Sequence, residues 1–194
     1  MNFRAFLLAL PILLAACGQN AADPEPPLAG ARIGGPFTLT NQEGKSVSDR
    51  DFAGQYRLMY FGYTFCPDVC PVDLQKLMAG YRELEKSDPK TAAKVAPIFV
   101  SIDPERDTPP VLKQYVQAFH PKLTGLTGTP QQIAATAKEY AVIYQKAQTP
   151  GSTSYLMDHS RVAYLFGPKG EPIALISHDG APQQIAGELK RWVR

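Results

Sequence analysis

The sequence predicts an α/β fold in which a central mixed β-sheet is flanked by helices and preceded by a β-hairpin. Three patterns carry this prediction: continuous apolar runs of strand length, amphipathic segments with helical spacing, and short alternating segments joined by Gly-containing turns. The chain has 194 residues, of which 44% are hydrophobic, so it holds enough apolar material for one packed core.

The first predicted element is the hairpin. Residues 37–40 (FTLT) and 45–48 (KSVS) alternate between apolar and polar side chains, and residues 41–44 (NQEG) form a turn signal between them. A strand buried on both faces follows at residues 57–64, because the run RLMYFGYT is almost continuously apolar or aromatic. Apolar residues at helical spacing then predict a helix over residues 71–87.

The later elements follow from the same signals. A second buried strand is expected at residues 95–102, and helices begin at Pro109 and Pro130, since proline is favoured in the first helical turn. A second hairpin over residues 161–177 and an amphipathic helix over residues 183–193 close the chain. This order, with parallel β-α-β units and a cysteine motif after the first long strand, is typical of a thioredoxin-like fold.

The first 30 residues differ in composition from the rest. Residues 1–16 hold one basic residue and an apolar run too short to cross a bilayer, the layout of a secretory signal. Residues 14–17 (LAAC) resemble the lipobox of bacterial lipoproteins. We therefore expect a lipoprotein signal peptide at residues 1–16, a lipid on Cys17, a flexible tether at residues 17–30 and the folded domain at residues 31–194. The alternative is a plain signal peptide in which the cysteine is incidental.

The charge balance argues against nucleic acid as a partner. The chain has 20 Lys and Arg residues against 18 Asp and Glu residues, a formal net charge of +2. Proteins that grip phosphate backbones usually concentrate basic residues on one face or helix. We expect no nucleic-acid partner.

The remaining cysteines, Cys66 and Cys70, lie where the first long strand runs into a helix. The partial positive charge of the helix N-terminus favours the thiolate form of both. Pro67 and Pro71 stiffen the segment, so we expect both sulfurs in a fixed loop ahead of the helix. Two soft thiolates favour Cu(I) or Zn(II) over hard cations and leave room for at least one further ligand.

A histidine is the natural third ligand, and the chain has three. His120 stands at a helix exit, where we expect it to be exposed to solvent, and His178 is interpreted as a turn residue. His159 precedes the strand at residues 161–166, in a loop that faces the cysteine motif of a thioredoxin-like fold. From the residues alone, His159 is either a ligand or an ordinary loop residue.

Three motifs resemble those of the Sco/SenC family. They are residues 62–71 (GYTFCPDVCP), residues 100–109 (VSIDPERDTP) and residues 158–160 (DHS), in the order found in that family. The resemblance extends from about Ile33 to the C-terminus. It implies a thioredoxin-like, membrane-anchored protein that binds copper, as Cu(I) or Cu(II), and turns over no substrate.

The resemblance also implies a set of ligands and a target. Cys66, Cys70 and His159 would hold the copper and deliver it to the copper-bearing subunit of cytochrome c oxidase, where it helps to build the dinuclear centre. An upstream copper chaperone would supply the metal. A lipid on Cys17, in place of the transmembrane helix of many relatives, would hold the protein on the periplasmic side of the inner membrane in a bacterial cell envelope.

Other functions use the same cysteines. In the main alternative, Cys66 and Cys70 are the redox-active pair of a thiol-disulfide oxidoreductase that reduces the cysteines of that copper centre. Such enzymes usually have two residues between the cysteines, whereas this chain has three. A thiol peroxidase would have a threonine where this chain has Tyr63. A purely structural disulfide would close a loop too short to constrain the unfolded chain strongly.

Several residues beside the motifs have open roles. Asp103, Glu105 and Asp107 are expected in turns and helix caps, with a carboxylate cluster as the alternative. Asp158 could orient the loop or tune the imidazole of its neighbour. Met157 either packs in the core or supplies a soft sulfur to the metal.

Overall fold

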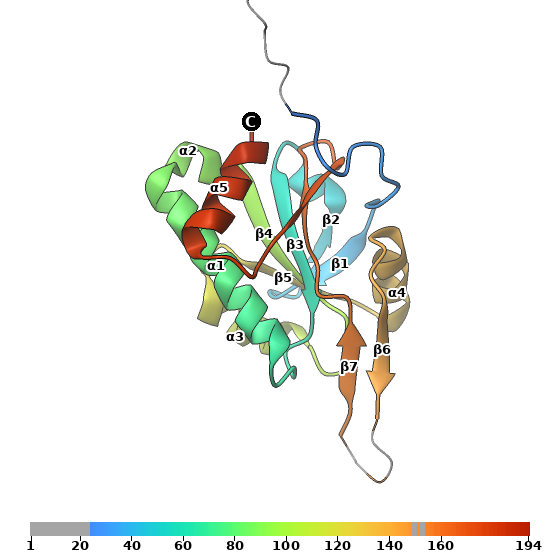
Figure 1. Cartoon of the computed structure of the whole chain (residues 1–194). Helices are drawn as coiled ribbons and strands as arrows, with labels where there is room; N and C mark the ends of the chain where they lie inside the picture. The colour runs from blue at the N-terminus through green and yellow to red at the C-terminus, as the bar shows by residue number, and fades with distance from the viewer. Residues whose placement is uncertain (1–23, 149–150, 152–153) are drawn as a thin grey trace, which may run out of the picture.

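The described residues form a seven-stranded mixed β-sheet with helices on both faces (Figure 1). The structure is a computed structural model that describes residues 24–148, 151 and 154–194. Its strands in chain order are β1 (Thr38–Asn41), β2 (Ser46–Ser48), β3 (Tyr56–Gly62), β4 (Val95–Ser101), β5 (Thr124–Thr127), β8 (Ala163–Phe166) and β9 (Pro172–Ile176). Across the sheet the order is β2-β1-β5-β4-β3-β8-β9. Because β3 pairs in parallel with β4 and antiparallel with β8, the predicted mixed sheet is confirmed.

The helices lie close to where the apolar periodicity predicts them. They are α1 (Val69–Ser87), α2 (Pro89–Ala92), α3 (Pro109–Phe119), α4 (Pro130–Glu139) and α5 (Pro182–Trp192), with a short 3₁₀ helix, η1 (Asp49–Phe52). Helices α1 and α5 pack against each other on one side of the sheet, and α4 covers the other side (Figure 1). The predicted N-terminal hairpin is present as β1 and β2, which pair antiparallel.

The main element that the sequence did not predict is an additional hairpin, which lies outside the seven-stranded sheet. Strands β6 (Tyr144–Ala147) and β7 (Leu156–His159) pair antiparallel and project from one end of the molecule (Figure 1). Most of their residues are exposed or only half-buried, so they lack the apolar runs that mark β3 and β4. His159 is therefore the last residue of a strand, opposite Tyr144, and not part of a loop.

Helix α1 begins earlier than predicted. Its first residue is Val69, so Cys70 lies in the first helical turn and not in a loop before the helix. Pro71 is the third helical residue, where a backbone N–H has no partner within the helix. The missing donor of proline therefore costs the helix no hydrogen bond.

The C-terminal end of the segment predicted as a tether, residues 17–30, is hydrogen-bonded to the folded domain. The Leu28 N–H donates to the carbonyl of Ile173 in β9 at 3.0 Å, and the Ala29 N–H closes a turn onto Pro26 at 2.9 Å. Strand β9 is an edge of the sheet, so its free backbone groups are available to a passing segment. The predicted signal peptide and Cys17 lie outside the described residues. No helix in the described part of the chain is both long and apolar enough to span a bilayer.

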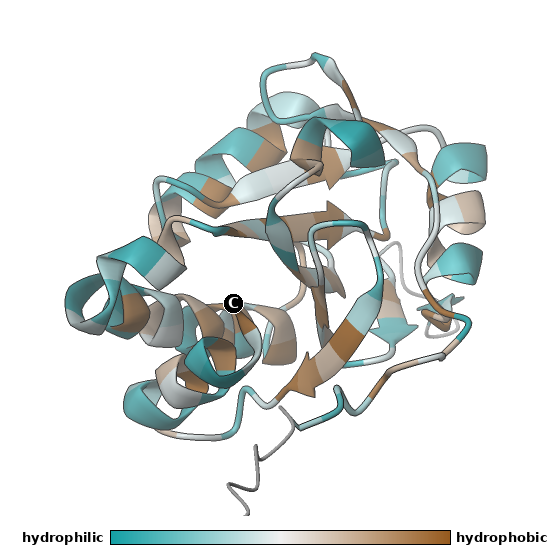
Figure 2. Ribbon diagram, turned by 90° about the horizontal axis from the view of Figure 1, so that it is seen from above, coloured by the Kyte–Doolittle hydropathy of each residue, from teal (hydrophilic) through white to brown (hydrophobic). Residues whose placement is uncertain are grey.

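The core lies on both faces of the two central strands. All seven residues of β3 are buried, which is the arrangement that its continuous apolar run predicts. Viewed from above, apolar residues gather on the strands and on the inner faces of the helices, and polar residues face outward (Figure 2). Helix α1 contributes an apolar face made of Leu74, Leu77, Met78, Tyr81 and Leu84.

Gly80 allows α1 to approach α5 closely, which leads to a testable difference between two helical glycines. A Cβ atom at Gly80 would lie 2.5 Å from the Cβ of Ile185 in α5. We expect Gly80→Ala to lower the free energy of unfolding by about 1–3 kcal/mol, because the overlap outweighs the better helix propensity of alanine. Gly187→Ala is the matched control, since a Cβ there meets no atom within 4 Å. It should raise stability by up to about 1 kcal/mol. Urea unfolding followed by circular dichroism measures both, and equal effects would contradict this account.

Candidate metal centre

Cys66, Cys70 and His159 come together at the end of the sheet where β3 and β4 finish. Cys66 lies in the loop that follows β3, Cys70 lies in the first turn of α1, and His159 ends β7. Parallel strands place their carboxyl ends at one edge of a sheet, which is where ligand sites form in such folds. The three residues singled out in the sequence are therefore neighbours in space.

Two contacts join these three residues, one between side chains and one from a backbone N–H. The Cys70 Sγ is 3.1 Å from the His159 Nε2. The Cys70 N–H donates to the Cys66 Sγ at 3.4 Å, so this sulfur accepts from a backbone donor of the first turn of α1. Both cysteines are free thiols. In the part of the chain that the structure describes, no three His, Cys, Asp or Glu side chains are already arranged to hold a metal ion. Binding would require the sulfurs and the imidazole to close around it.

The imidazole of His159 is held in the tautomer that leaves Nε2 free. Its Nδ1 is 3.1 Å from the carbonyl of Ser160, and a carbonyl only accepts, so the neutral ring carries its proton on Nδ1. The lone pair of Nε2 then faces Cys70, whose S–H donates to it. Burial lowers the pKa of His159, which keeps the ring neutral at pH 7. A neutral imidazole with an oriented second nitrogen is the form that binds metals.

The two thiols differ in acidity. Burial opposes ionisation of Cys66, but hydrogen bonds from the backbone N–H groups of Cys70 and Asp68 outweigh it and lower the pKa of the Cys66 thiol. Burial raises the pKa of Cys70 far above that of an ordinary thiol, and the nearby sulfur of Cys66 adds to this effect. The prediction that the helix N-terminus favours both thiolates is therefore wrong for Cys70. Its desolvation is larger than the effect of the helix dipole.

Two tyrosines restrict the orientation of the His159 ring. The rings of Tyr60 and Tyr63 meet it edge to face, with centroids 6.3 and 6.1 Å away and interplanar angles of 87° and 88°. Both tyrosines are almost completely buried. The imidazole is thus held in place by packing as well as by its hydrogen bond to Ser160.

A buried carboxylate that the sequence analysis missed supports the site from behind. Asp73 is in α1, three residues after Cys70, and it accepts hydrogen bonds from Tyr60 Oη at 2.9 Å and from Arg161 Nε and Nη2 at 2.9 and 2.6 Å. Arg161 stands two residues after His159. This bidentate ion pair connects the segment that carries His159 to the helix that carries Cys70. The sequence does contain a sign of this role, because Asp73 is a carboxylate on the apolar face of the predicted helix, beside Leu74 and Leu77.

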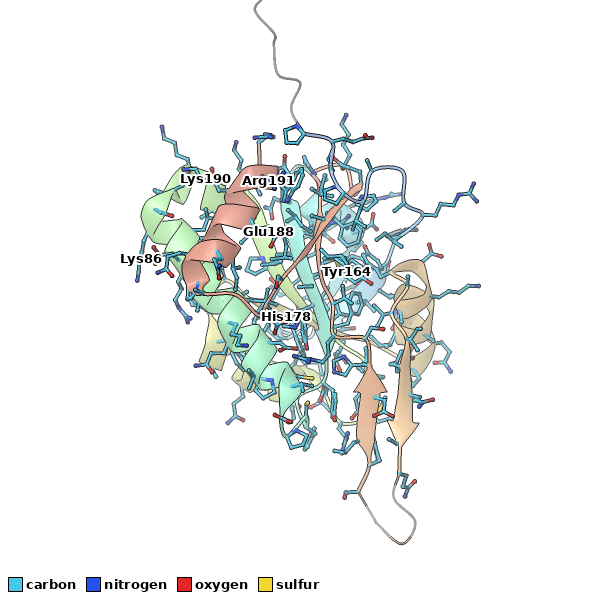
Figure 3. All side chains as sticks on the ribbon, viewed as in Figure 1. Lys86, Tyr164, His178, Glu188, Lys190 and Arg191 are labelled. Atoms are coloured by element: carbon cyan, nitrogen blue, oxygen red, sulfur yellow. The ribbon has the colours of Figure 1, made fainter. Side chains whose placement is uncertain are left out.

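The other two histidines are buried, which corrects the solvent exposure expected for His120, whereas His178 lies in the bend after β9, in line with its interpretation as a turn residue. His178 packs beside α1, with its Nε2 3.4 Å from Asp73 Oδ2 (Figure 3). His120 is 4% exposed, because it packs edge to face on Tyr81 and its Nε2 lies 3.1 Å from Glu85 Oε2. Neither is hydrogen-bonded to a cysteine sulfur within the described residues.

The acidic motif after β4 supports the cysteine loop. Asp107 is buried and accepts hydrogen bonds from Thr64 N at 3.0 Å, Thr64 Oγ1 at 2.6 Å and Ser101 Oγ at 2.6 Å. It thereby ties the residues before Cys66 to β4, while the N-cap of α3 is Thr108. The expectation of a capping role is wrong for Asp107. The predicted turn is present, since the N–H groups of residues 106 and 107 donate to the carbonyl of Asp103.

In the described part of the chain, neither Met157 nor Asp158 is hydrogen-bonded to the His159 imidazole. Asp158 is exposed and lies 3.4 Å from Gln145 Nε2, so the partner of the His159 ring is the backbone of Ser160. Met157 is 6% exposed and belongs to the core. Of its two proposed roles, packing in the core is the one that the structure shows.

A dithiol and an oriented imidazole at the end of a thioredoxin-like sheet define a class of protein that binds a soft metal or exchanges disulfides. The sequence profile of the SCO1/SenC family matches residues 25–194, so the chain belongs to this family. SCO1 homolog 1 from the mitochondria of Arabidopsis thaliana is 46% identical over 152 residues, which are 78% of this chain and 44% of that protein. The chain spans about half the length of the curated relatives that it matches first.

Solved structures show the same similarity. Copper-bound ScoI of Bradyrhizobium japonicum has a TM-score of 0.75 and 42% sequence identity, and the match covers 82% of this chain and 99% of that one. BsSco, described as having a disulfide switch, is a member of the Sco family of cytochrome c oxidase assembly proteins. Its TM-score is 0.62 at 26% identity, with 80% of this chain and 90% of that chain covered. These similarities confirm the family and the fold predicted from the motifs.

The different acidities predict different reaction rates for the two thiols. Only the thiolate attacks an alkylating reagent, and each unit of pKa changes its fraction about tenfold. In the reduced protein, iodoacetamide should therefore modify Cys66 more than about tenfold faster than Cys70 at neutral pH. The half-maximal rate for Cys66 should be reached at a lower pH than for an ordinary exposed thiol, because the pKa of Cys66 is lowered. Peptide mass spectrometry over time, with Cys66→Ser to isolate Cys70, measures both rates. Equal rates would contradict the assigned acidities.

Proposed function

We propose that this protein binds one copper ion through Cys66, Cys70 and His159 and delivers it to the dinuclear centre of cytochrome c oxidase. The observation that carries this proposal is the 3.1 Å contact between the Cys70 Sγ and the unprotonated Nε2 of His159, beside the second sulfur of Cys66. Two soft sulfurs suit Cu(I), and the imidazole extends the site to Cu(II). The similarity to a ScoI structure that holds copper supports the metal, and the similarity to BsSco supports the target.

The difference between the two cysteines gives an order of binding. Cys66 is half-exposed and its pKa is lowered, so its thiolate is the first soft donor that an incoming ion meets. Cys70 is buried and holds its proton, which must leave when the sulfur bonds to the metal. Copper affinity should therefore rise with pH. In delivery the order reverses, so that the exposed sulfur of Cys66 is the last to release the ion to the acceptor.

Exposed apolar side chains near the site support a protein as the acceptor. Phe65, Val72, Ile143 and Leu156 are between 44% and 78% exposed. Phe65 and Val72 belong to the segment that carries the cysteines, Ile143 directly precedes β6, and Leu156 is the first residue of β7, the strand that carries His159. Apolar residues gathered around a reactive group are typical of a protein interface. We propose that the copper-bearing subunit of the oxidase docks here, as does the chaperone that supplies the copper.

The alternative function, a thiol-disulfide oxidoreductase for the same copper centre, is favoured by one observation. A half-exposed thiol of lowered pKa beside a buried thiol of raised pKa is the arrangement of an attacking and a resolving cysteine. Both functions need Cys66 and Cys70. Only metal binding needs the lone pair of His159.

Replacing His159 separates the two functions. In the reduced protein, His159→Ala should weaken copper binding by more than roughly 10- to 100-fold. That range is typical when a residue that only hydrogen-bonds to a metal ligand is replaced, whereas here a ligand itself is lost. Exchange of the dithiol with oxidised glutathione should persist near the original rate. Competition with a Cu(I) chelator and a stopped-flow exchange assay measure the two properties.

His120→Gln is the control, since His120 is a buried histidine that lies away from the sulfurs and bonds to Glu85. It should keep the copper affinity of the natural protein. If oxidase maturation in cells fails in His159→Ala while disulfide exchange persists, metal delivery is supported. Normal maturation without copper binding would instead favour the reductase function.

We propose further that Cys17 is acylated after removal of residues 1–16 and holds the protein on the periplasmic side of the inner membrane. Cys17→Ser should then move the protein from the membrane fraction into the soluble periplasmic fraction, because the variant loses its acyl chains. Each CH₂ of those chains that is buried in the bilayer contributes about 0.8 kcal/mol to membrane binding. Fractionation with immunoblotting measures the distribution, and copper binding by the solubilised variant serves as the control for an intact domain. Full retention of Cys17→Ser in membranes would contradict acylation.

A further inference from the structure

Arg57 places a guanidinium inside the protein at the end of the sheet opposite the cysteines. It is the second residue of β3 and is 4% exposed, with its Cζ 5.5 Å from the centre of the Phe166 ring. Its single hydrogen bond within the described residues is a long one, from Nη1 to Tyr140 Oη at 3.5 Å. It forms no ion pair in that part of the chain. A buried cation without an anionic partner is costly.

The guanidinium borders two adjoining cavities of about 190 and about 240 Å³, which share Asp49, Arg57, Lys169 and Gly170. One wall is the η1 segment and another is the turn between β8 and β9. Gly170 has a φ of +87°, and a Cβ there would lie 2.8 Å from the Arg57 Nη2. The turn therefore needs glycine at this position, both for its backbone conformation and to admit the guanidinium.

The charges around these cavities are mainly positive. Arg50, Arg57 and Lys169 face a single lining carboxylate, that of Asp49. The Asp49 Oδ1 already accepts the N–H of Phe37 at 3.3 Å. The nearby Glu171 is turned towards the backbone, where its Oε2 accepts the N–H of Lys169 at 2.9 Å. Among the residues that line the two cavities, three basic side chains thus face one carboxylate, in a space large enough for a small anion.

We propose that this cavity is a binding site for a phosphate group, with Arg57 as its main ligand and Arg50 and Lys169 at its entrance. The planar fork of an arginine matches the oxygens of a phosphate, and a lysine adds a point charge. The group could come from free inorganic phosphate or from a phospholipid head group. Residues 34–36 also line one cavity, and this segment leads back towards Cys17. A lipid on Cys17 would bring this end of the molecule to the bilayer.

The site is separate from the proposed copper centre. The N-terminal segment and the C-terminus lie at the Arg57 end of the molecule, whereas the β6–β7 hairpin projects from the other end (Figure 1). A head group bound at Arg57 would therefore turn the cysteines away from the membrane surface. Phosphate binding and copper binding can be measured independently on the same protein.

The test is isothermal titration of the full chain in detergent with two probes, inorganic phosphate and water-soluble dioctanoyl phosphatidylglycerol, at constant ionic strength. At least one probe should bind saturably with one site per chain. Arg57→Met, which keeps the apolar stem against Phe166, should weaken that binding by about tenfold or more, the loss expected for a charged hydrogen bond. Lys169→Met should weaken it severalfold. Lys113→Met removes the same charge from an exposed position on α3 and should leave binding unchanged.

The pattern across probes identifies the source of the phosphate. Binding of the lipid alone supports a head-group site, and binding of inorganic phosphate alone supports a site for the free anion. Near-ultraviolet circular dichroism verifies the fold of each variant, and if Arg57→Met does not fold, the Arg50→Met and Lys169→Met double variant replaces it. The proposal is overturned if neither probe binds, or if the variants bind as tightly as the natural protein and Lys113→Met.

Discussion

The candidate metal centre depends on one buried charge, the carboxylate of Asp73. Burial alone would raise its pKa, but the hydrogen bonds from Arg161 and Tyr60 lower it, so it remains ionised and needs those partners. Removing the partner of a buried charge costs on the order of 3 kcal/mol or more. Arg161 is therefore held against α1. Because Arg161 stands two residues after His159, it also holds the end of β7 next to α1. The distance between the Cys70 sulfur and the His159 imidazole follows from this constraint, because each is within three residues of one member of the pair.

The sheet adds a second constraint, which makes the two cysteines different. Strand β3 is buried along its whole length, so the chain emerges from the core just before Cys66 and re-enters it at Cys70. Asp107 fixes the exit by binding Thr64, and the start of α1 fixes the return. One sulfur thus accepts backbone hydrogen bonds at a half-exposed helix start, and the other is desolvated in the core. The same topology supplies an exposed thiolate for an incoming ion or disulfide and a protected thiol behind it.

The elements with many apolar residues could be predicted from the sequence, and those that depend on partners distant in the chain could not. Strands β3 and β4, helix α3 and both predicted hairpins follow from local patterns of burial and turns. The β6–β7 hairpin has no apolar run, so its pairing was not visible, and His159 was placed in a loop. Cys66 and Cys70 could be singled out because few residue types bind soft metals, and His159 joined them through the resemblance of the three motifs to the Sco/SenC family. Asp73 and Arg161 were missed because they are 88 residues apart and neither belongs to a motif.

A single proton connects the two functions that the site supports. The S–H of Cys70 faces the lone pair of His159 on one side and the sulfur of Cys66 on the other. In the proposed copper delivery, an ion that bonds to Cys66 would attract both remaining donors, so that the proton would leave and the imidazole would become a ligand. In the alternative function, a disulfide that reacts with Cys66 would form a mixed disulfide, which Cys70 would resolve after losing the same proton. In both proposed functions the outcome would depend on what reaches Cys66, and the exposed apolar residues around it would favour a protein that presents either a copper ion or a disulfide.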